Sequence, residues 1–110
     1  PTYTPGSGDV SVTLTLTATG NGSCGDATDD MILTITPAAT ADAGSGGETC
    51  EGVDYTVSGA TATNYASLLW THDGNGTLSN ATTLTPTYTP GSGDVSVTLT
   101  LTATGNGSCG

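Results

Sequence analysis

The sequence PTYTPGSGDVSVTLTLTATGNGSCG occupies residues 86–110, and residues 1–25 carry the same letters in the same order. The two copies start 85 residues apart (86 − 1). This spacing is longer than the roughly 20–50 residues of solenoid repeats and close to the roughly 100 residues of a small β-domain. We therefore expect a tandem array of period 85 in which each period forms one domain.

The repeated stretch predicts a β-strand. Between residues 10 and 18, Val, Leu and Ala alternate with Ser and Thr, so one face is expected to be buried and the other hydrated. Similar alternation occurs at residues 31–36, 53–58, 66–72, 82–89 and 95–104, with turn sequences such as Asp73-Gly74-Asn75-Gly76 between them. No segment has a helical period. The pattern predicts an all-β, antiparallel immunoglobulin-like β-sandwich.

A domain boundary is expected at Thr36–Pro37. Proline ends the strand expected at residues 31–36, and the following residues 38–47 are small and rich in Gly. Residues 1–36 are then the C-terminal strands of one repeat. Residues 37–110 are the next repeat, which lacks its last strand and is completed by the following repeat unit.

The core of each domain is expected between two sheets. Trp70, the only Trp, lies on the third main strand and is expected to fill the space between the sheets. Tyr55 and Tyr88 are expected at the edge of the core, with their hydroxyls at the rim. The remaining expected core residues are leucines of the repeated strand: Leu14, Leu16, Leu99 and Leu101.

The charged residues are all acidic. The chain has ten acidic residues, no Lys and no Arg, and a formal net charge of −10. Without cations it cannot replace the counterions of nucleic acid or of an anionic membrane, so neither is an expected partner. No apolar run approaches the roughly 18 residues of a membrane span, and no membrane insertion is expected.

Each period contains two cysteines, because Cys109 repeats Cys24. One pair per domain fits a disulfide in an oxidising, extracellular setting. The first pairing to consider joins Cys50 to Cys109 within one domain, and Cys24 then pairs with the cysteine of the preceding repeat. If Cys50 and Cys109 lie at opposite ends of the domain, Cys50 bridges instead to the loop cysteine of an adjacent domain.

Catalysis and metal binding have only weak candidates. His72 and Asp73 could be drawn into a hydrolase triad, but a lone His beside a turn, without a nucleophile-elbow sequence, indicates no enzyme. Weak calcium candidates are Asp26, Asp29 and Asp30 together, and Asp73, whose turn resembles the start of a calcium loop without its later ligands. Solvated loop charges explain Asp26, Asp29 and Asp30 better, and a plain turn explains Asp73 better, so no cofactor is expected.

Three segments carry a resemblance to a known family: Cys50-Glu51-Gly52, Ser67-Leu68-Leu69-Trp70-Thr71, and Tyr88-Thr89-Pro90 with the strand at residues 97–102. Together with the whole chain they resemble the tandem immunoglobulin-like (PKD-like) repeats of giant surface adhesins, which gliding bacteria export by the type IX secretion system. The resemblance implies an extracellular, cell-surface filament or stalk that serves adhesion or gliding motility. Its expected partners are neighbouring repeats of the same chain and laterally associated filaments.

Two functions are therefore weighed. The first is a structural repeat of an adhesin stalk, whose stability is approximately additive over domains. The alternative is a calcium- or carbohydrate-binding module that acts by avidity. A solvent-exposed Trp70 in a groove would favour the alternative.

Overall fold

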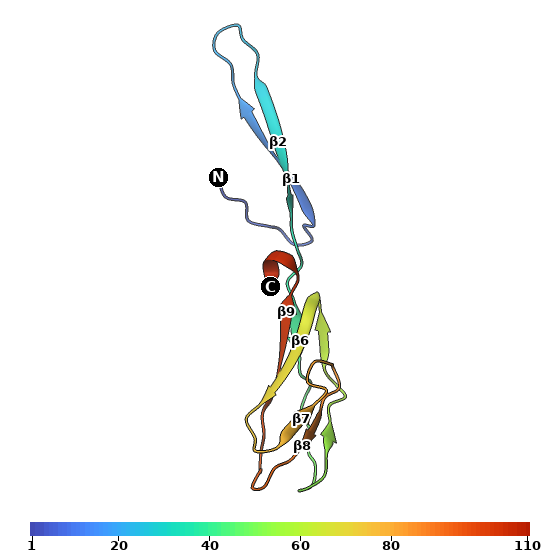
Figure 1. Cartoon of the computed structure of the whole chain (residues 1–110). Coiled ribbons are helices and arrows are strands. Elements are labelled where there is room, and N and C mark those ends of the chain that lie inside the picture. Colours follow the sequence, from blue (N-terminus) through green and yellow to red (C-terminus); the bar gives the residue numbers. More distant parts are fainter. The chain divides into compact units, whose positions relative to one another are not determined.

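The computed structural model describes all 110 residues and divides them into two compact units, Pro1–Pro37 and Ala38–Gly110 (Figure 1). We call them the N-terminal and C-terminal units. Every strand pairing is antiparallel, and the only helical element is the short 3-10 turn η1 (Gly107–Cys109). The chain is therefore an all-β protein. It contains no helix with the length and apolarity of a membrane span.

The N-terminal unit is a hairpin of β1 (Ser11–Ala18) and β2 (Ala27–Thr34), drawn in blue and cyan in Figure 1. Leu14 lies opposite Met31, and the ladder continues beyond β1 where the Ile35 N–H donates to the Val10 carbonyl oxygen at 2.7 Å. Only β2 pairs with β1, and no second sheet of this unit covers the apolar face. A two-stranded hairpin on its own is marginally stable in water at best.

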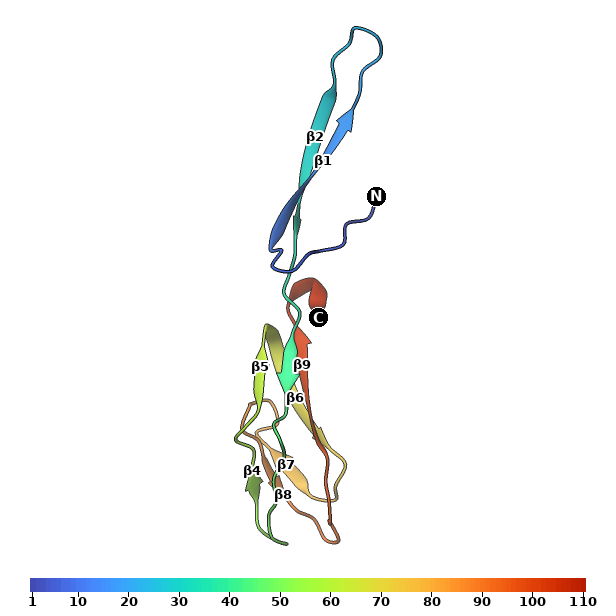
Figure 2. The same ribbon diagram turned by 180° about the vertical axis from the view of Figure 1, so that it is seen from behind.

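The C-terminal unit contains three small sheets, seen from both sides in Figures 1 and 2. Their strand orders are β3–β5, β4–β8–β7 and β6–β9. The strands are β3 (Thr40–Asp42), β4 (Tyr55–Thr56), β5 (Thr61–Thr63), β6 (Tyr65–His72), β7 (Thr77–Ser79), β8 (Thr87–Thr89) and β9 (Leu99–Gly105).

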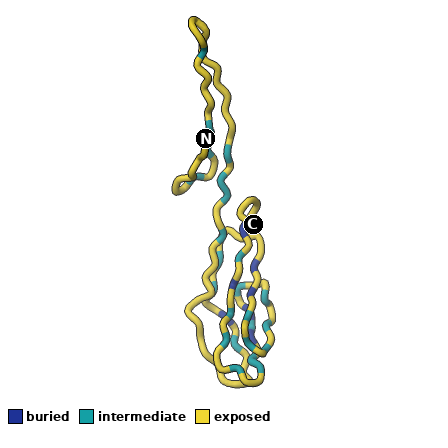
Figure 3. The backbone as a smooth tube through the Cα atoms, turned by 90° about the vertical axis from the view of Figure 1, so that its left-hand side faces the viewer, coloured by how far each residue is buried: buried dark blue, intermediate teal, exposed yellow.

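The core of the C-terminal unit forms where side chains of β6 and β9 meet those from the other sheets. Its buried cluster consists of Val57, Leu68, Trp70 and Leu101, and Trp70 is 3 % exposed. The buried stretches all lie in the C-terminal unit (Figure 3). Trp70 also donates its indole Nε1–H to the Thr83 carbonyl oxygen at 2.8 Å. A buried indole N–H needs such a partner, so this contact fixes the ring in the core.

Most of the residues expected in the core are at least half-buried. Tyr88 and Leu101 are buried, and Tyr55, Leu99 and Leu14 are half-buried. Leu16 does not lie in a core as expected, because its side chain is 73 % exposed. Its strand has the expected alternation, but the hairpin offers no opposite sheet against which Leu16 could pack.

The two identical stretches differ in secondary structure. In the first copy the strand begins at Ser11, whereas in the second it begins at Leu99, three residues later than the equivalent Ser96. Residues 11–13 form a ladder with β2, while residues 96–98 have no strand beside them. The sequence is the same, so the neighbouring strand decides whether these residues join a sheet.

The strand expected at residues 82–89 is also shorter than predicted. Only Thr87–Thr89 pairs, because Asn80 adopts φ of 55° and starts a turn that the Thr83 N–H closes onto the Asn80 carbonyl oxygen at 3.2 Å. Asn tolerates this left-handed conformation better than most residues. The Thr83 hydroxyl donates to the same oxygen at 2.9 Å, which reinforces the turn.

Candidate functional site: a cleft beside strand β9

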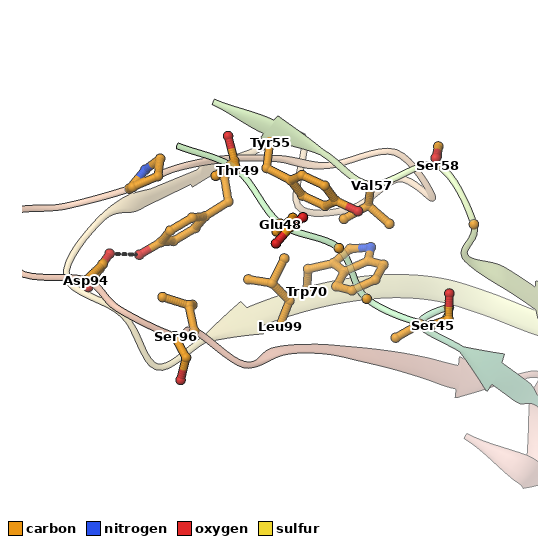
Figure 4. Close-up of a pocket in the computed structure, with 18 of the residues that line it drawn as sticks. Ser45, Glu48, Thr49, Tyr55, Val57, Ser58, Trp70, Asp94, Ser96 and Leu99 are labelled. Carbon is orange, nitrogen blue, oxygen red and sulfur yellow. Dashed lines mark hydrogen bonds between the residues drawn. The ribbon is translucent and has the colours of Figure 1, made fainter. Parts of the chain in front are cut away.

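An open cleft of about 520 Å³ runs along the C-terminal unit. One wall is the Gly-rich segment 43–51 and the other is the segment 94–97 that leads to Leu99, as Figure 4 shows. Val57, Trp70 and Leu99 line its apolar part, so the cleft opens directly onto the core. A well-packed sandwich would leave no such space beside its core residues.

The edge of β9 beside this cleft is unpaired, since β6 is the only strand hydrogen-bonded to β9. In an antiparallel ladder, successive residues direct their backbone N–H and C=O groups to opposite sides. The Trp70 N–H donates to the Ala81 carbonyl oxygen at 2.7 Å and therefore points away from β9. Leu101, the ladder partner of Trp70, accordingly directs its own backbone groups away from β6, toward the unpaired edge.

The first copy of the strand uses this same edge. Because Val10 accepts from Ile35, Val10 and every second residue after it direct their backbone groups toward β2. This set includes Leu16, the equivalent of Leu101. The two copies therefore pair through opposite edges, β1 with β2 and β9 with β6, and the unused edge of β9 carries the groups that bind β2 in the hairpin.

One end of the cleft is closed by a hydrogen-bonded cluster around Asp94. Its carboxylate accepts from the Tyr88 hydroxyl at 2.6 Å, from the Gly91 N–H at 2.8 Å and from the Asn75 N–H at 2.9 Å. The Gly76 N–H donates to the Tyr88 oxygen at 2.8 Å. Gly is required at position 76, because an added Cβ would collide with a neighbouring carbonyl oxygen. Two turns and β8 are thereby tied together.

The cluster shifts the pKa values of both side chains. Burial, followed by the hydrogen bond to Asp94, raises the pKa of Tyr88 above its ordinary value of 10.0. The hydrogen bond from Tyr88, followed by the backbone N–H donors, lowers the pKa of Asp94 below its ordinary value of 3.8. The same pair recurs in the first copy, where the Tyr3 hydroxyl donates to Asp9 at 2.6 Å. The alternation pattern does not predict this pair, and its only signal in the sequence is a Tyr followed six residues later by an Asp in both copies.

We expect Tyr88→Phe to lower the denaturant midpoint of the C-terminal unit, monitored by Trp70 fluorescence, because Asp94 then loses its hydroxyl donor. Since the Asp94 pKa is lowered by folding, its contribution is lost as the pH falls below about 4. Since the Tyr88 pKa is raised by folding, its contribution is present below about pH 10 and is lost as the pH rises further. Tyr88→Phe removes the alkaline loss. Tyr3→Phe is the matched control and should leave the Trp70 transition unchanged.

His72 and Asp73 serve structural contacts. The His72 ring packs edge-on against Tyr88 with 5.1 Å between ring centroids, and its Nδ1 accepts from the Gly74 N–H at 3.2 Å. Asp73 accepts from the Thr98 N–H at 2.8 Å. This bond holds residues 95–105, which we call the β9 segment, against the turn after β6. No nucleophilic side chain joins them within these contacts.

The weak calcium candidates are not gathered. Asp29 accepts from the N–H of Asp30, and Asp26 accepts from the Gly20 N–H at 3.4 Å. The structure contains no group of three or more His, Cys, Asp or Glu side chains placed to hold a metal ion.

The structure does not contain the disulfide that was expected between Cys50 and Cys109. Both cysteine side chains are exposed. Cys50 lines the cleft together with Val95, at the start of the β9 segment, whereas Cys109 follows the end of β9 at Gly105. A disulfide requires Cα atoms within about 7 Å, and opposite ends of a seven-residue strand are about 20 Å apart.

Comparison with protein families, with curated proteins and with solved structures gave no match to this chain.

Proposed function

We propose that the chain is a structural segment of an extracellular adhesin stalk built from tandem immunoglobulin-like sandwiches. The single observation that carries this proposal is the 25-residue duplication whose two copies pair through opposite edges. In a repeating array, each copy of this sequence would have one neighbour on each edge, an equivalent of β6 and an equivalent of β2. This chain shows one of these two pairings at each copy. Residues 26–37 would then supply the last strand of one sandwich, and the same sequence one period later would supply the last strand of the next.

The strand orders support this assignment. β5 and β4 belong to one stretch of chain, so β3–β5 and β4–β8–β7 together have the order of the four-stranded A-B-E-D sheet of immunoglobulin domains. β6, which carries the buried Trp70, and β9 correspond to strands C and F. No strand of this unit would correspond to strand G, and β2, which pairs with the first copy, would take that position in the proposed sandwich. Completed in this way, the sandwich has seven strands.

The avidity alternative receives less support. A sugar site needs an aromatic face open to solvent, but Trp70 is 3 % exposed and its indole N–H is already bonded inside the unit. The carboxylates are also not gathered into a group of three or more that could hold calcium. The stalk is therefore the function that the site supports best.

The stalk proposal is tested with recombinant arrays of one, two and four periods. Forced extension should give one equal step per added period, each releasing up to roughly 300 Å of chain for 85 residues. Antibodies raised against one unit should label intact cells that produce the parent protein. Unequal steps would contradict the repeat architecture, and labelling only of lysed cells would contradict the location.

An array makes the remaining cysteine pairing testable. The completing strand would run antiparallel to β9, from the Gly105 end toward the Val95 end, where Cys50 lies. The next unit would begin there. Its equivalent of Thr40 lies at its own Gly105 end, because Thr40 pairs with Thr63 and Tyr65 pairs with Gly105. Cys50 would therefore face the loop cysteine of the following unit.

In an oxidised two-period array we expect a crosslink between Cys50 and the equivalent of Cys109 in the following unit. The crosslink should stabilise the array by about 2–4 kcal/mol. Non-reducing peptide mapping measures it, with a protease other than trypsin because the chain has no Lys or Arg. Cys50→Ser should remove the crosslink. Because the two loop cysteines lie in identical peptides, the array with Cys109→Ser in the first unit alone decides between them, and loss of the crosslink in that array would contradict this pairing.

A further inference from the structure

The cleft matches one particular strand of this protein. We propose that the cleft of the C-terminal unit receives strand β2 of a second copy of the chain, which adds to the unpaired edge of β9. This inference rests on the proposed completion of the sandwich by the sequence 26–37, and it adds that the strand can come from another molecule.

The register of the hairpin places three apolar side chains of β2 beside residues that line the cleft, and Asp29 opposite Leu101. Since Leu14 pairs with Met31 and is equivalent to Leu99, an added β2 would set Met31 opposite Leu99. Leu33 would then lie opposite Val97, and Ile35 opposite Val95. All three residues of the β9 segment, Leu99, Val97 and Val95, line the cleft, and Val95 is 99 % exposed without the added strand.

Exchange from β1 to β9 keeps the pairing and adds burial. Residues 11–18 and 96–103 have the same sequence, so β2 can form the same ladder with either. On the hairpin, Met31 is 56 % exposed and Leu33 half-buried, whereas in the cleft they would contact Leu99 and Val97 beside Trp70. Removing the remaining apolar surface of these side chains from water is favourable in proportion to the area buried. The exchange is therefore driven by the apolar area that the hairpin leaves in water.

The β2 strand of the same chain cannot reach this position. Thr40, the first residue of β3, lies at the Gly105 end of β9, because it pairs with Thr63 and the nearby Tyr65 pairs with Gly105. If Ile35 of the same chain lay opposite Val95, residues 35–40 would have to span the distance from Val95 to the Gly105 end. Ten residue steps separate Val95 from Gly105, roughly 33 Å when the whole segment is extended alongside an added strand. The five residue steps from Ile35 to Thr40 span at most about 18 Å.

Each copy therefore carries one donor strand and one acceptor cleft on different surfaces. Such a contact is heterologous, and it propagates from copy to copy unless the rotation closes a ring. The expected product is a series of oligomers joined head to tail. With a formal net charge of −10, the copies repel one another, so association should strengthen as salt shortens the Debye length to about 3 Å at 1 M.

The test is sedimentation of the full chain over a concentration series in reducing buffer with 1 M salt. We expect oligomers that grow with concentration and that shorten when a free peptide of residues 26–37 is added. Leu33→Asp, on the cleft-facing side of β2, should raise the dissociation constant about tenfold or more. Ile32→Asp is the matched control on the opposite face, where Ile32 is already 70 % exposed, and should leave association unchanged.

Trp70 fluorescence is expected to report a folded C-terminal unit in both variants, because the substitutions lie in the N-terminal unit. A chain that stays monomeric at every concentration overturns the inference, as does association that Leu33→Asp leaves intact. To separate this outcome from failure of the proposed function, the sequence 26–37 is also fused after Gly110. If the fused strand stabilises the unit while the unfused chain remains monomeric, only the second-copy inference fails. If neither effect is seen, both fail.

Discussion

Fusing the sequence 26–37 directly after Gly110 is expected to raise the free energy of unfolding of the C-terminal unit by several kcal/mol. The added strand would follow the loop 105–110 as β2 follows the loop after β1, and would pair with the free edge of β9. Three apolar side chains, equivalent to Met31, Leu33 and Ile35, would enter the cleft at about 1.5–3 kcal/mol each. The entropy of ordering the added strand offsets part of this gain.

The measurement is urea unfolding of chains with and without the fused strand, followed by the fluorescence of Trp70, which is the only Trp. The slope of free energy against urea should also increase, because more surface is buried on folding. Asp at the fused equivalent of Leu33 should abolish the gain, while Asp at the equivalent of Ile32 should retain it. The two positions are neighbours, and neighbouring side chains of a strand point to opposite faces, so only the equivalent of Leu33 would enter the cleft. Equal effects of both substitutions would show that the fused segment does not pair in the proposed register.

Much of the fold follows from local sequence pattern. The alternation along the repeated strand is a property of neighbouring residues, and the structure has strands at those places. The Asp-Gly and Asn-Gly sequence after His72 predicts a hairpin, but the chain bends there from β6 to β7 of a different sheet. The buried position of Trp70 also follows, because one large aromatic residue on an alternating strand has few other places to pack.

The cleft and the Tyr88–Asp94 cluster depend on contacts that the pattern does not encode. Residues 43–51 look featureless in sequence, and they form a wall of the cleft where no second strand is hydrogen-bonded to β9. Leu16 and Leu101 have the same neighbours in sequence and opposite burial. Alternation identifies the face that would be buried, but whether it is buried depends on the sheet that lies opposite.

The second large expected effect is the difference in stability loss between alanine substitutions at Leu101 and at Leu16. Leu101→Ala should destabilise the C-terminal unit by about 2–5 kcal/mol, because its side chain is 9 % exposed and packs in the cluster with Trp70. Leu16→Ala removes the same atoms from the same local sequence, but from a side chain that is 73 % exposed. Its effect on the stability of the chain should stay within about 0.5 kcal/mol. Urea unfolding, followed by Trp70 fluorescence and by circular dichroism for the hairpin, measures both.

The repeat architecture makes a stronger prediction for Leu16 in a longer chain. If the sequence 38–85 is placed before Pro1, the first copy of the strand gains the same surroundings as the second, including an equivalent of Trp70. Leu16→Ala in that chain should then cost about 2–5 kcal/mol in the unfolding of the completed unit, as Leu101→Ala does. The substitution is unchanged and only the opposite sheet has been added, so the difference measures what that sheet contributes. If Leu16→Ala remained silent in the longer chain, the two copies would not occupy equivalent positions, and the proposed period-85 sandwich would be wrong.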